Sequence, residues 1–318
     1  MPYLFIFLFS LLVSAVLTFY LRKVGNRYNF FDIAPEDDVL KIHKKSISYL
    51  GGSAMMLTIF IGFILTVCLK QYLISEIMAV AAASLAIFSL GFWDDLKWKN
   101  IPDPRPYRKF AGLIIFPLLS AFILSAVGIK INFFNFFLLD YLLTFFYIFV
   151  LVNSINYEDG IDGLAGGMSL LSLAAFSVVS LLANNEFALF LSLIAGGSVL
   201  GFLLFNFPPA KIFMGDSGAF FLGFVLSVFA TLLVKPYDLF SLLGVIFISG
   251  FPIFEGVFTN IRRILSKKSI FLGDREHLYD KLYLKKGFSI YKTLLICYSI
   301  QIIFIIIGFI FFYANTFI

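Results

Sequence analysis

Charged residues and cysteines are scarce in this sequence. Only 14% of its 318 residues are charged and 61% are hydrophobic, whereas a soluble globular domain carries about 25% charged residues. This excludes an ordinary soluble domain. The two cysteines, Cys68 and Cys297, lie in apolar stretches, where a thiol behaves as a small hydrophobic group. The sequence therefore predicts neither a disulfide nor a cysteine metal site.

Long apolar runs dominate the chain, and its mean hydropathy is +0.98. A hydrocarbon core about 30 Å thick is crossed by about 20 apolar residues in a helix. Ten stretches meet this requirement, near residues 3–21, 49–69, 74–92, 109–129, 133–153, 163–183, 187–205, 212–234, 239–261 and 290–313. The first has no basic leader or small-residue cleavage site, so we expect a retained helix. The sequence predicts an all-α integral membrane protein with about ten transmembrane helices, and residues 1–318 form a single polytopic domain.

The basic residues fall almost entirely on one side of these spans. If both termini are outside, only Lys70, Lys130 and Lys235 of the 24 Lys and Arg residues lie outside. Lysine and arginine collect in cytoplasmic loops of membrane proteins. The asymmetry therefore predicts both termini outside and an even number of spans. It also explains the net charge of +5, with no nucleic acid as a partner.

A polar stretch separates two apolar runs between Asn153 and Gly167. Asparagine or aspartate stands at every third position, at Asn153, Asn156, Asp159 and Asp162. On a helix this spacing keeps the side chains close together. The Asp-Gly pairs favour a helix break instead, with Asp159 or Asp162 capping the next helix. In either case, polar groups gather at a membrane face. Because polar groups are costly there, we expect this stretch to form part of a functional site.

Acidic residues from separate segments fall at the predicted cytoplasmic ends of spans. They are Asp94, Asp95, Glu158, Asp159, Asp162 and Asp216. Each alone is equally well explained as a solvated loop acid, but together they indicate a site at the cytoplasmic face. Oxygen ligands, with no cysteine nearby and only two histidines in the chain, suit a hard cation. We expect Mg²⁺, with Mn²⁺ as the alternative, held by carboxylates and substrate phosphates.

Two of these acidic motifs also have simpler explanations. Asp94 and Asp95 are adjacent, so one carboxylate can stay a base while the other binds a cation. An Asp-Asp pair by itself is nevertheless a weak signal. Asp216 lies in a glycine-rich turn, where backbone can approach a ligand closely. Considered alone, Asp216 or Ser217 is better explained as the N-cap of the eighth span.

Four motifs follow one another along the chain, and a fifth is present in part. They are His43…Gly51-Gly52, Asp94-Asp95, Asn153-x-x-Asn156-x-x-Asp159-Gly-x-Asp162-Gly-Leu-Ala-Gly, Asn206-x-x-Pro-Ala-x-Ile-Phe-Met-Gly-Asp216-Ser-Gly, and the partial Arg262-Arg263…Asp274-Arg-Glu-His277-Leu-x-x-x-Leu282. With these motifs the chain resembles the polyprenyl-phosphate N-acetylhexosamine-1-phosphate transferases. In bacteria this superfamily begins the synthesis of peptidoglycan lipid, O-antigen and teichoic acid linkage units. Ten spans with both termini outside agree with it.

The resemblance implies transfer of a sugar 1-phosphate from a UDP-N-acetylhexosamine, with UDP-GlcNAc preferred, to undecaprenyl or another polyprenyl phosphate, with release of UMP. Mg²⁺ would bridge the diphosphate, with Asp216 as the main ligand and Asp95 as a second. Asp94 would deprotonate the lipid phosphate, so Asp94 and Asp95 form the catalytic pair; a covalent route through an aspartate stays open. The substrate-binding residues would be Lys44, Asn153, Asn156, Asp159, Asp162, Asn206, Phe213, Arg262, Arg263, Arg275 and His277. A prokaryotic plasma membrane is the expected location, and a homodimer is left open.

Several positions depart from the pattern of this superfamily. Tyr157 and Glu158 replace an uncharged pair, Glu255 stands where Asp is common, and Tyr279 and Asp280 replace the later histidines of a cluster. The loss of these histidines argues against the pentapeptide-using branch. It favours a simple UDP-N-acetylhexosamine donor for an O-antigen, capsule or similar glycan. The resemblance gives Glu158 no role.

Two other classes of membrane protein fit parts of the sequence. A polytopic secondary transporter with a cytoplasmic acidic site fits the many spans, although transport sites lie near the midplane and often between repeats. An intramembrane aspartyl protease needs two facing aspartates. Its candidate partner for Asp216 is Asp140, which lies on the predicted outer side.

Overall fold

The computed structural model describes residues 2–32, 46–69, 74–98, 106–267 and 274–314. Most of these residues are helical, and the sheet among them is one antiparallel pair of two-residue strands. The elements are α1 (Pro2–Tyr28), β1 (Phe31–Asp32), β2 (Ile47–Ser48), α2 (Gly51–Leu69), α3 (Ile74–Trp98), α4 (Pro106–Ala126), α5 (Phe137–Glu158), α6 (Leu164–Leu182), α7 (Glu186–Asn206), α8 (Gly215–Leu233), α9 (Leu239–Ile248), α10 (Gly250–Leu265), α11 (Leu278–Asp280), a π-helical turn (Lys281–Lys285) and α12 (Ile290–Ala314). The predicted all-α class is confirmed.

Nine of the described helices, α1 to α8 and α12, are long and apolar enough to cross a membrane. They match nine of the ten predicted stretches and define a multi-pass membrane protein. Some run further than predicted: α1 continues to Tyr28 and α3 to Trp98. Hydropathy marks the apolar part of a helix and not its polar ends, which accounts for these extensions.

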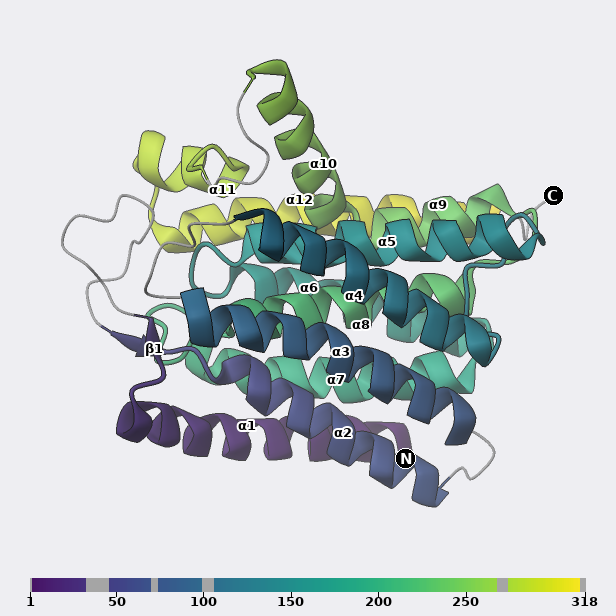
Figure 1. Cartoon of the computed structure of the whole chain (residues 1–318), viewed down its shortest axis with the longest axis horizontal. Coiled ribbons are helices and arrows are strands. Elements are labelled where there is room, and N and C mark those ends of the chain that lie inside the picture. The colour runs from purple at the N-terminus through teal and green to yellow at the C-terminus, as the bar shows by residue number, and fades with distance from the viewer. Residues whose placement is uncertain (1, 33–45, 70–73, 99–105, 268–273, 315–318) are drawn as a thin grey trace.

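The ninth predicted stretch, residues 239–261, is not one straight helix. α9 and α10 meet at Ser249 and are bent by 84°. Gly250 and Pro252 follow at once, and proline has no N–H to continue a helix across this point. The predicted tenth span is present only if this bent pair counts as one span, since hydropathy does not report direction. α10 leaves the bundle at the break and extends away from it, above α5 and α12 in Figure 1.

Helix α8 is the centre of the bundle. It packs against α3 and α5, and also contacts α2. Its four phenylalanines Phe220, Phe221, Phe224 and Phe229 are fully buried. Lipid is as apolar as these rings, so close packing rather than exclusion of water holds α8 among its neighbours. The first turn of α8 is thereby fixed against the end of α3 and the end of α5.

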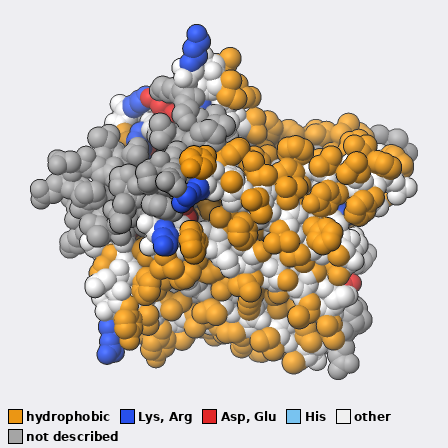
Figure 2. Space-filling view, in the orientation of Figure 1, with side chains coloured by type: hydrophobic (Ala, Val, Ile, Leu, Met, Phe, Trp, Pro, Cys, Tyr) orange, Lys and Arg blue, Asp and Glu red, His pale blue; other side chains and the backbone are white. Residues whose placement is uncertain are grey.

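Helix α1 begins and α12 ends at the same end of the bundle, and the strand β1 lies at the other end (Figure 1). This agrees with an even number of crossings if the bent pair counts as one span. Which end faces the cytoplasm stays a prediction. Figure 2 shows hydrophobic side chains over much of the visible flank, with most of the visible Lys and Arg side chains towards the end that carries β1.

Candidate active site

Three charged side chains meet where α3 ends and where α4 and α8 begin. Lys109 Nζ donates hydrogen bonds to Asp94 Oδ2 at 2.7 Å and to Asp216 Oδ2 at 2.5 Å. The side chains of Asp94 and Asp216 are 13% and 17% exposed, so ligands can reach them from solvent. Two carboxylates thus converge on one cationic group at the end of the bundle. We call Asp94, Lys109 and Asp216 the acidic centre.

Asp95 points away from the acidic centre and into the protein. It is 2% exposed, and its two oxygens accept the backbone N–H groups of Asp216 and Ser217, both at 2.9 Å. These donors belong to the first turn of α8, where helix N–H groups lack partners and carry partial positive charge. Asp95 therefore caps α8 and fixes Asp216. The explanation of Asp216 or Ser217 as the N-cap itself is excluded, since both lie inside α8. The catalytic and metal-binding roles of Asp95 stay predictions.

Helix α5 brings Asn156 to the acidic centre. Asn156 Nδ2 donates to Asp216 Oδ1 at 3.2 Å, so Asp216 contacts α4 and α5 through different oxygens. Asn153 lies one turn earlier and donates to the carbonyl of Phe149 in its own helix at 2.7 Å. α5 ends just before Asp159, which is its C-terminal cap residue. The helix break favoured by the Asp-Gly pairs is therefore confirmed.

Asp162 connects the loop after α5 to the loop after α7. Its Oδ2 atom accepts the backbone N–H of Ala210 at 2.8 Å. The expectation that Asp159 or Asp162 caps α6 is wrong, because Gly163 occupies the cap position and no side chain makes a capping hydrogen bond there. Gly163 adopts a left-handed conformation with φ of 80°, which glycine allows and which ends the loop in a sharp turn.

Asn206 joins the same two loops from the end of α7. Its Oδ1 atom accepts the N–H of Gly163 at 3.1 Å, and its Nδ2 atom donates to the carbonyl of Ile212 at 2.9 Å. The second loop then reaches the start of α2, where Gly51 N–H donates to the carbonyl of Phe213 at 2.9 Å. Asn206 is 3% exposed, so its amide groups hold the loops together in this structure.

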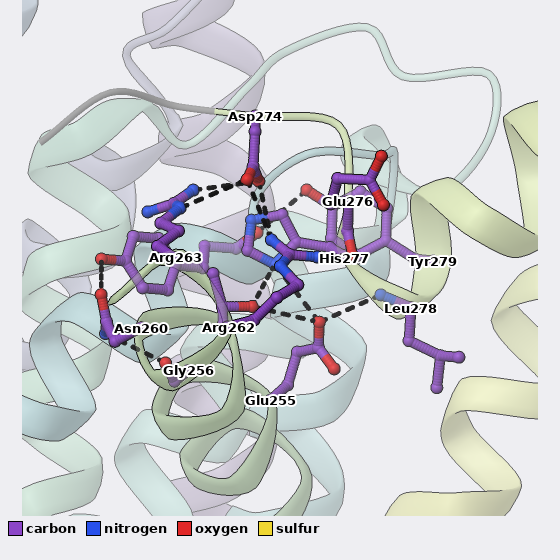
Figure 3. Close-up of polar contacts among 12 residues, drawn as sticks. Glu255, Gly256, Asn260, Arg262, Arg263, Asp274, Glu276, His277, Leu278 and Tyr279 are labelled. Atoms are coloured by element: carbon purple, nitrogen blue, oxygen red, sulfur yellow. Dashed lines mark hydrogen bonds and ion pairs between the residues drawn. The ribbon is translucent and has the colours of Figure 1, made fainter. Parts of the chain in front are cut away.

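A second polar cluster is formed by α10 and the segment that follows it (Figure 3). Arg262 Nη2 contacts both carboxylate oxygens of Asp274 at 3.0 Å, and Arg263 Nη2 donates to Asp274 Oδ1 at 3.1 Å. Glu255 Oε1 lies 3.3 Å from His277 Nδ1. Burial opposes ionisation of Asp274, but hydrogen bonding to Arg263 and the charges of both arginines lower the pKa of Asp274 below its usual range. We call these five residues the arginine cluster.

Tyr157 at the end of α5 links the arginine cluster to the rest of the bundle. The guanidinium of Arg263 lies 5.3 Å from the centroid of the Tyr157 ring, a cation–π distance. The Tyr157 hydroxyl donates to Asn260 Oδ1 at 3.4 Å, and its ring centroid is 5.5 Å from that of His277. The cluster is therefore attached to the same helix that carries Asn156.

The positions that depart from the superfamily pattern are neighbours in space. The Tyr279 hydroxyl donates to the carbonyl of Tyr157 at 3.0 Å, and Asp280 Oδ1 pairs with Arg275 Nη1 at 3.1 Å. Burial raises the pKa of Asp280, although Arg275 opposes the shift. Glu158 is fully buried, and neither of its carboxylate oxygens has a hydrogen-bond partner in the part of the chain that the structure describes.

The predicted residues thus divide among three adjoining places. Asp94 and Asp216 lie in the acidic centre, where Asn156 contacts Asp216 and the buried Asp95 holds the first turn of α8. Asp162, Asn206 and Phe213 organise the loops. Arg262, Arg263 and His277 belong to the arginine cluster, with Arg275 beside it. Lys44 lies outside the described residues. Lys109 and Asp274 also belong to the site, although neither was predicted as a site residue from the sequence. The position of Lys109 in the sequence could have indicated this role: it lies near the start of the span that follows Asp94, on the same predicted face of the membrane.

Asp140 lies at the opposite end of α5 from the acidic centre. It is fully buried and pairs with Lys130 Nζ at 2.8 Å. Sixteen helical residues separate Asp140 from Asn156, which at 1.5 Å per residue is about 24 Å. Since Asn156 contacts Asp216, Asp140 and Asp216 do not form the facing pair that an aspartyl protease needs.

Fold and site together define a polytopic membrane protein with carboxylates gathered at one end of its bundle. The family described as glycosyl transferase family 4 matches residues 77–234, which include Asp94, Lys109, Asn156 and Asp216. A relative from Bacillus subtilis (strain 168), the "probable undecaprenyl-phosphate N-acetylglucosaminyl 1-phosphate transferase", is 34% identical over 94% of this chain and 82% of its own length.

Two further relatives cover nearly the whole chain. The undecaprenyl-phosphate alpha-N-acetylglucosaminyl 1-phosphate transferase of Thermotoga maritima is 30% identical over 93% of this chain and 88% of its own. The phospho-N-acetylmuramoyl-pentapeptide-transferase of Dictyoglomus thermophilum is 31% identical over 96% and 95%. The chain therefore belongs to the polyprenyl-phosphate N-acetylhexosamine-1-phosphate transferase superfamily, and the resemblance in its motifs is confirmed.

Proposed function

We propose that the protein transfers N-acetylhexosamine 1-phosphate from a UDP-N-acetylhexosamine to a polyprenyl phosphate and releases UMP. The reaction would be the first membrane step in the synthesis of a cell-envelope glycan, at the plasma membrane of a prokaryote. The observation that carries the proposal is the position of Lys109 Nζ between Asp94 and Asp216. This arrangement suits phosphate groups that arrive together with a divalent cation.

The carboxylates of the acidic centre fit a magnesium ion. Asp94 and Asp216 both direct an oxygen at one cationic atom, and carboxylate oxygen is the ligand type that Mg²⁺ and Mn²⁺ take. No group of three or more His, Cys, Asp or Glu residues among those described is arranged to hold a metal. A protein that offers one or two carboxylates relies on substrate phosphates to complete the coordination. When bound, the metal would neutralise charge on the diphosphate, with Asp216 as its main protein ligand.

The residues of the acidic centre have distinct proposed tasks in the transfer. Asp94 accepts the proton of the polyprenyl phosphate, whose oxygen attacks the β-phosphorus of the donor. The bond from this phosphorus to the bridging oxygen then breaks, and UMP leaves. Because phosphoryl transfer depends mainly on positioning and charge neutralisation, Lys109 would bind a phosphate oxygen once the substrates draw it from the carboxylates. Asn156 keeps Asp216 in place through its hydrogen bond.

The neighbouring groups are suited to holding the donor. The two loops joined by Asp162 and Asn206 stand beside the acidic centre and would bind the nucleotide, with Phe213 beside them. Arg262 and Arg263 place two guanidinium groups on one carboxylate, Asp274, so these three residues carry one net positive charge that would face the diphosphate or sugar. A transporter would instead place such polar groups near the middle of its bundle. The particular N-acetylhexosamine, for which UDP-GlcNAc is preferred, is part of the proposal.

The proposal is tested with the purified protein in lipid nanodiscs, supplied with radiolabelled UDP-GlcNAc and undecaprenyl phosphate. We expect UMP release and a butanol-extractable sugar-pyrophosphoryl lipid, both lost when divalent metal is removed by chelation. Asp216→Ala should abolish the product. Lys109→Met should lower the rate by about 100-fold, the loss typical of one preorganised charge-stabilising group.

Control variants remove a carboxylate or an ammonium group at the opposite end of the bundle. Glu186 begins α7 and Lys235 follows α8, so Glu186→Gln and Lys235→Met should keep the wild-type rate. Full activity without divalent metal would contradict the metal assignment. Absence of any lipid product from the wild-type protein with every UDP-N-acetylhexosamine tried would contradict the proposed function.

A further inference from the structure

The break between α9 and α10 leaves backbone polar groups without helical partners inside the protein. The last carbonyls of one helix and the first N–H groups of the next have no partner in their own helix. Within a membrane-spanning bundle there is no water to replace them, and such a break persists only where side chains satisfy the freed groups. The groups in question are the carbonyl of Ile248, which is fully buried, and the N–H of Phe251, which is 4% exposed.

A single side chain, Gln301 on α12, satisfies both sides of this break. Its Oε1 atom accepts the N–H of Phe251 at 3.0 Å, and its Nε2 atom donates to the carbonyl of Ile248 at 2.7 Å. The second proton on Nε2 is donated to Ser172 Oγ on α6 at 2.9 Å. Gln301 is fully buried, so each of its polar atoms is committed to the break or to Ser172.

Helices α6 and α5 also contribute hydrogen bonds to the end of α9. The Ser172 hydroxyl donates to the same Ile248 carbonyl at 2.9 Å. The Tyr147 hydroxyl on α5 donates to the carbonyl of Val245 at 3.1 Å. Side chains from α5, α6 and α12 therefore converge on the last turn of α9. A buried amide that is satisfied on all sides fixes a single geometry and is costly to disturb.

Close packing of α12 against α9 and α10 fixes the position of Gln301 beside the break. A Cβ atom at Gly250 would lie 2.5 Å from the Phe304 ring, and a Cβ at Gly308 would lie 3.0 Å from the carbonyl oxygen of Gly244. α12 therefore touches α10 at Phe304 and α9 at Gly308, about one and two turns after Gln301, at contacts that only glycine permits. The amide of Gln301 is held opposite the break.

The direction of α10 matters because this helix carries the arginine cluster. A Cβ atom at Gly256 would lie 2.3 Å from Ser154 Oγ on α5, so α10 crosses α5 in close contact. From this crossing, Glu255, Arg262 and Arg263 reach His277 and Asp274. Figure 3 shows these side chains gathered over α10. A change of the bend would displace the whole cluster relative to the end of α5.

We infer that Gln301, supported by Ser172, is a positioning residue: it fixes the angle between α9 and α10 and thereby places the arginine cluster for the donor substrate. The first half of this inference concerns the fold alone, and the second half rests on the proposed function. A residue that only stabilised the fold would change the amount of active protein. A positioning residue changes where α10 lies and how the donor binds.

The angle is measured by electron paramagnetic resonance between spin labels in nanodiscs. Labels are attached to cysteines introduced at Leu265 on α10 and Leu295 on α12, which are 78% and 66% exposed. Exposed Cys68 is replaced by Ala, and buried Cys297 is retained because labels do not reach it. We expect one narrow distance in the otherwise wild-type protein and a broad or shifted distribution in Gln301→Met. Ser172→Ala should give a smaller change of the same kind. This variant tests the inference if Gln301→Met fails to fold.

The matched control is Ser299→Ala on the same helix, since the Ser299 hydroxyl is exposed and donates to the carbonyl of Leu295 in its own helix. It should leave the distance unchanged. In the transfer assay, the KM for the UDP-sugar should rise by about tenfold in Gln301→Met, which corresponds to about 1.4 kcal/mol of lost binding free energy, because the displaced arginines hold the donor less well. The KM for the lipid should stay the same.

The two measurements separate failure of the inference from failure of the proposed function. A wild-type distance distribution in folded Gln301→Met and Ser172→Ala would overturn the inference. A fall in kcat with no change in the donor KM would overturn the positioning role. If the wild-type protein has no transferase activity, the proposed function fails, and the distance measurement still decides whether Gln301 fixes the bend.

Discussion

The carboxylate of Asp95 accepts the backbone N–H of Asp216 at 2.9 Å, whereas the adjacent Asp94 faces Lys109 and solvent. Two neighbouring aspartates on one helix therefore have different surroundings. Asp95 stabilises the start of α8, and Asp94 is available to a substrate. This difference separates the effects of two substitutions that look equivalent in the sequence.

Asp95→Asn should lower stability, and Asp94→Asn should lower activity. An asparagine at position 95 keeps one acceptor oxygen and loses the other, so one N–H of α8 is left unsatisfied. The expected cost is about 1–3 kcal/mol in the free energy of unfolding, measured by thermal unfolding in detergent. Asp94→Asn should unfold close to the wild-type temperature while its transfer rate falls far more than its affinity for the UDP-sugar. Equal losses of rate and affinity would make Asp94 a ligand and not a base.

Acid should release the segment after residue 274 from α10. The pKa of Asp274 is lowered in the folded protein from its ordinary value of 3.8, so its ion pairs contribute stability above that pH. The contribution is lost as the pH falls through the folded pKa. The protection factors for hydrogen exchange in peptides covering residues 274–286, which allow for the slower intrinsic exchange at low pH, should therefore fall as the pH drops below about 5. Asp274→Asn should have low protection factors already at pH 5, with little further change; a wild-type profile in this variant would contradict the role given to Asp274.

Replacing Glu158 should stabilise the protein. This side chain is fully buried and its oxygens lack hydrogen-bond partners among the described residues. Burying such oxygens costs free energy of folding, and an apolar side chain of similar shape removes this cost. We expect Glu158→Met to raise the free energy of unfolding by about 1–3 kcal/mol. The matched control is Glu255→Met, which removes the acceptor of the Leu278 N–H and should destabilise. If both variants destabilise to the same extent, Glu158 has a partner in the functional protein.

Some features of this protein could be predicted from its sequence because they depend on local pattern. Apolar length indicates ten stretches, nine of which are straight helices, and the motifs place Asp94 and Asp216 in one site. The bend at Ser249 could not be predicted from apolar length, since α9 and α10 have the composition of one continuous span. Its fixing residue, Gln301, is 50 positions away from Phe251 in the chain. Lys109 and Asp216 are separated by 107 positions. Contacts of this kind depend on how the helices pack.

The location of one labelled phosphorus atom tests the central claim most directly. The donor is UDP-GlcNAc with ³²P in its β-phosphate, and the protein is given this donor with undecaprenyl phosphate and Mg²⁺. Transfer of a sugar 1-phosphate predicts that the label enters the butanol-extractable lipid in equal amount to the unlabelled UMP released. Both should be absent with Asp216→Ala and unchanged with Glu186→Gln. Label recovered in free UDP, with unlabelled phosphate in the lipid, would mean that the sugar alone is transferred and would contradict the account.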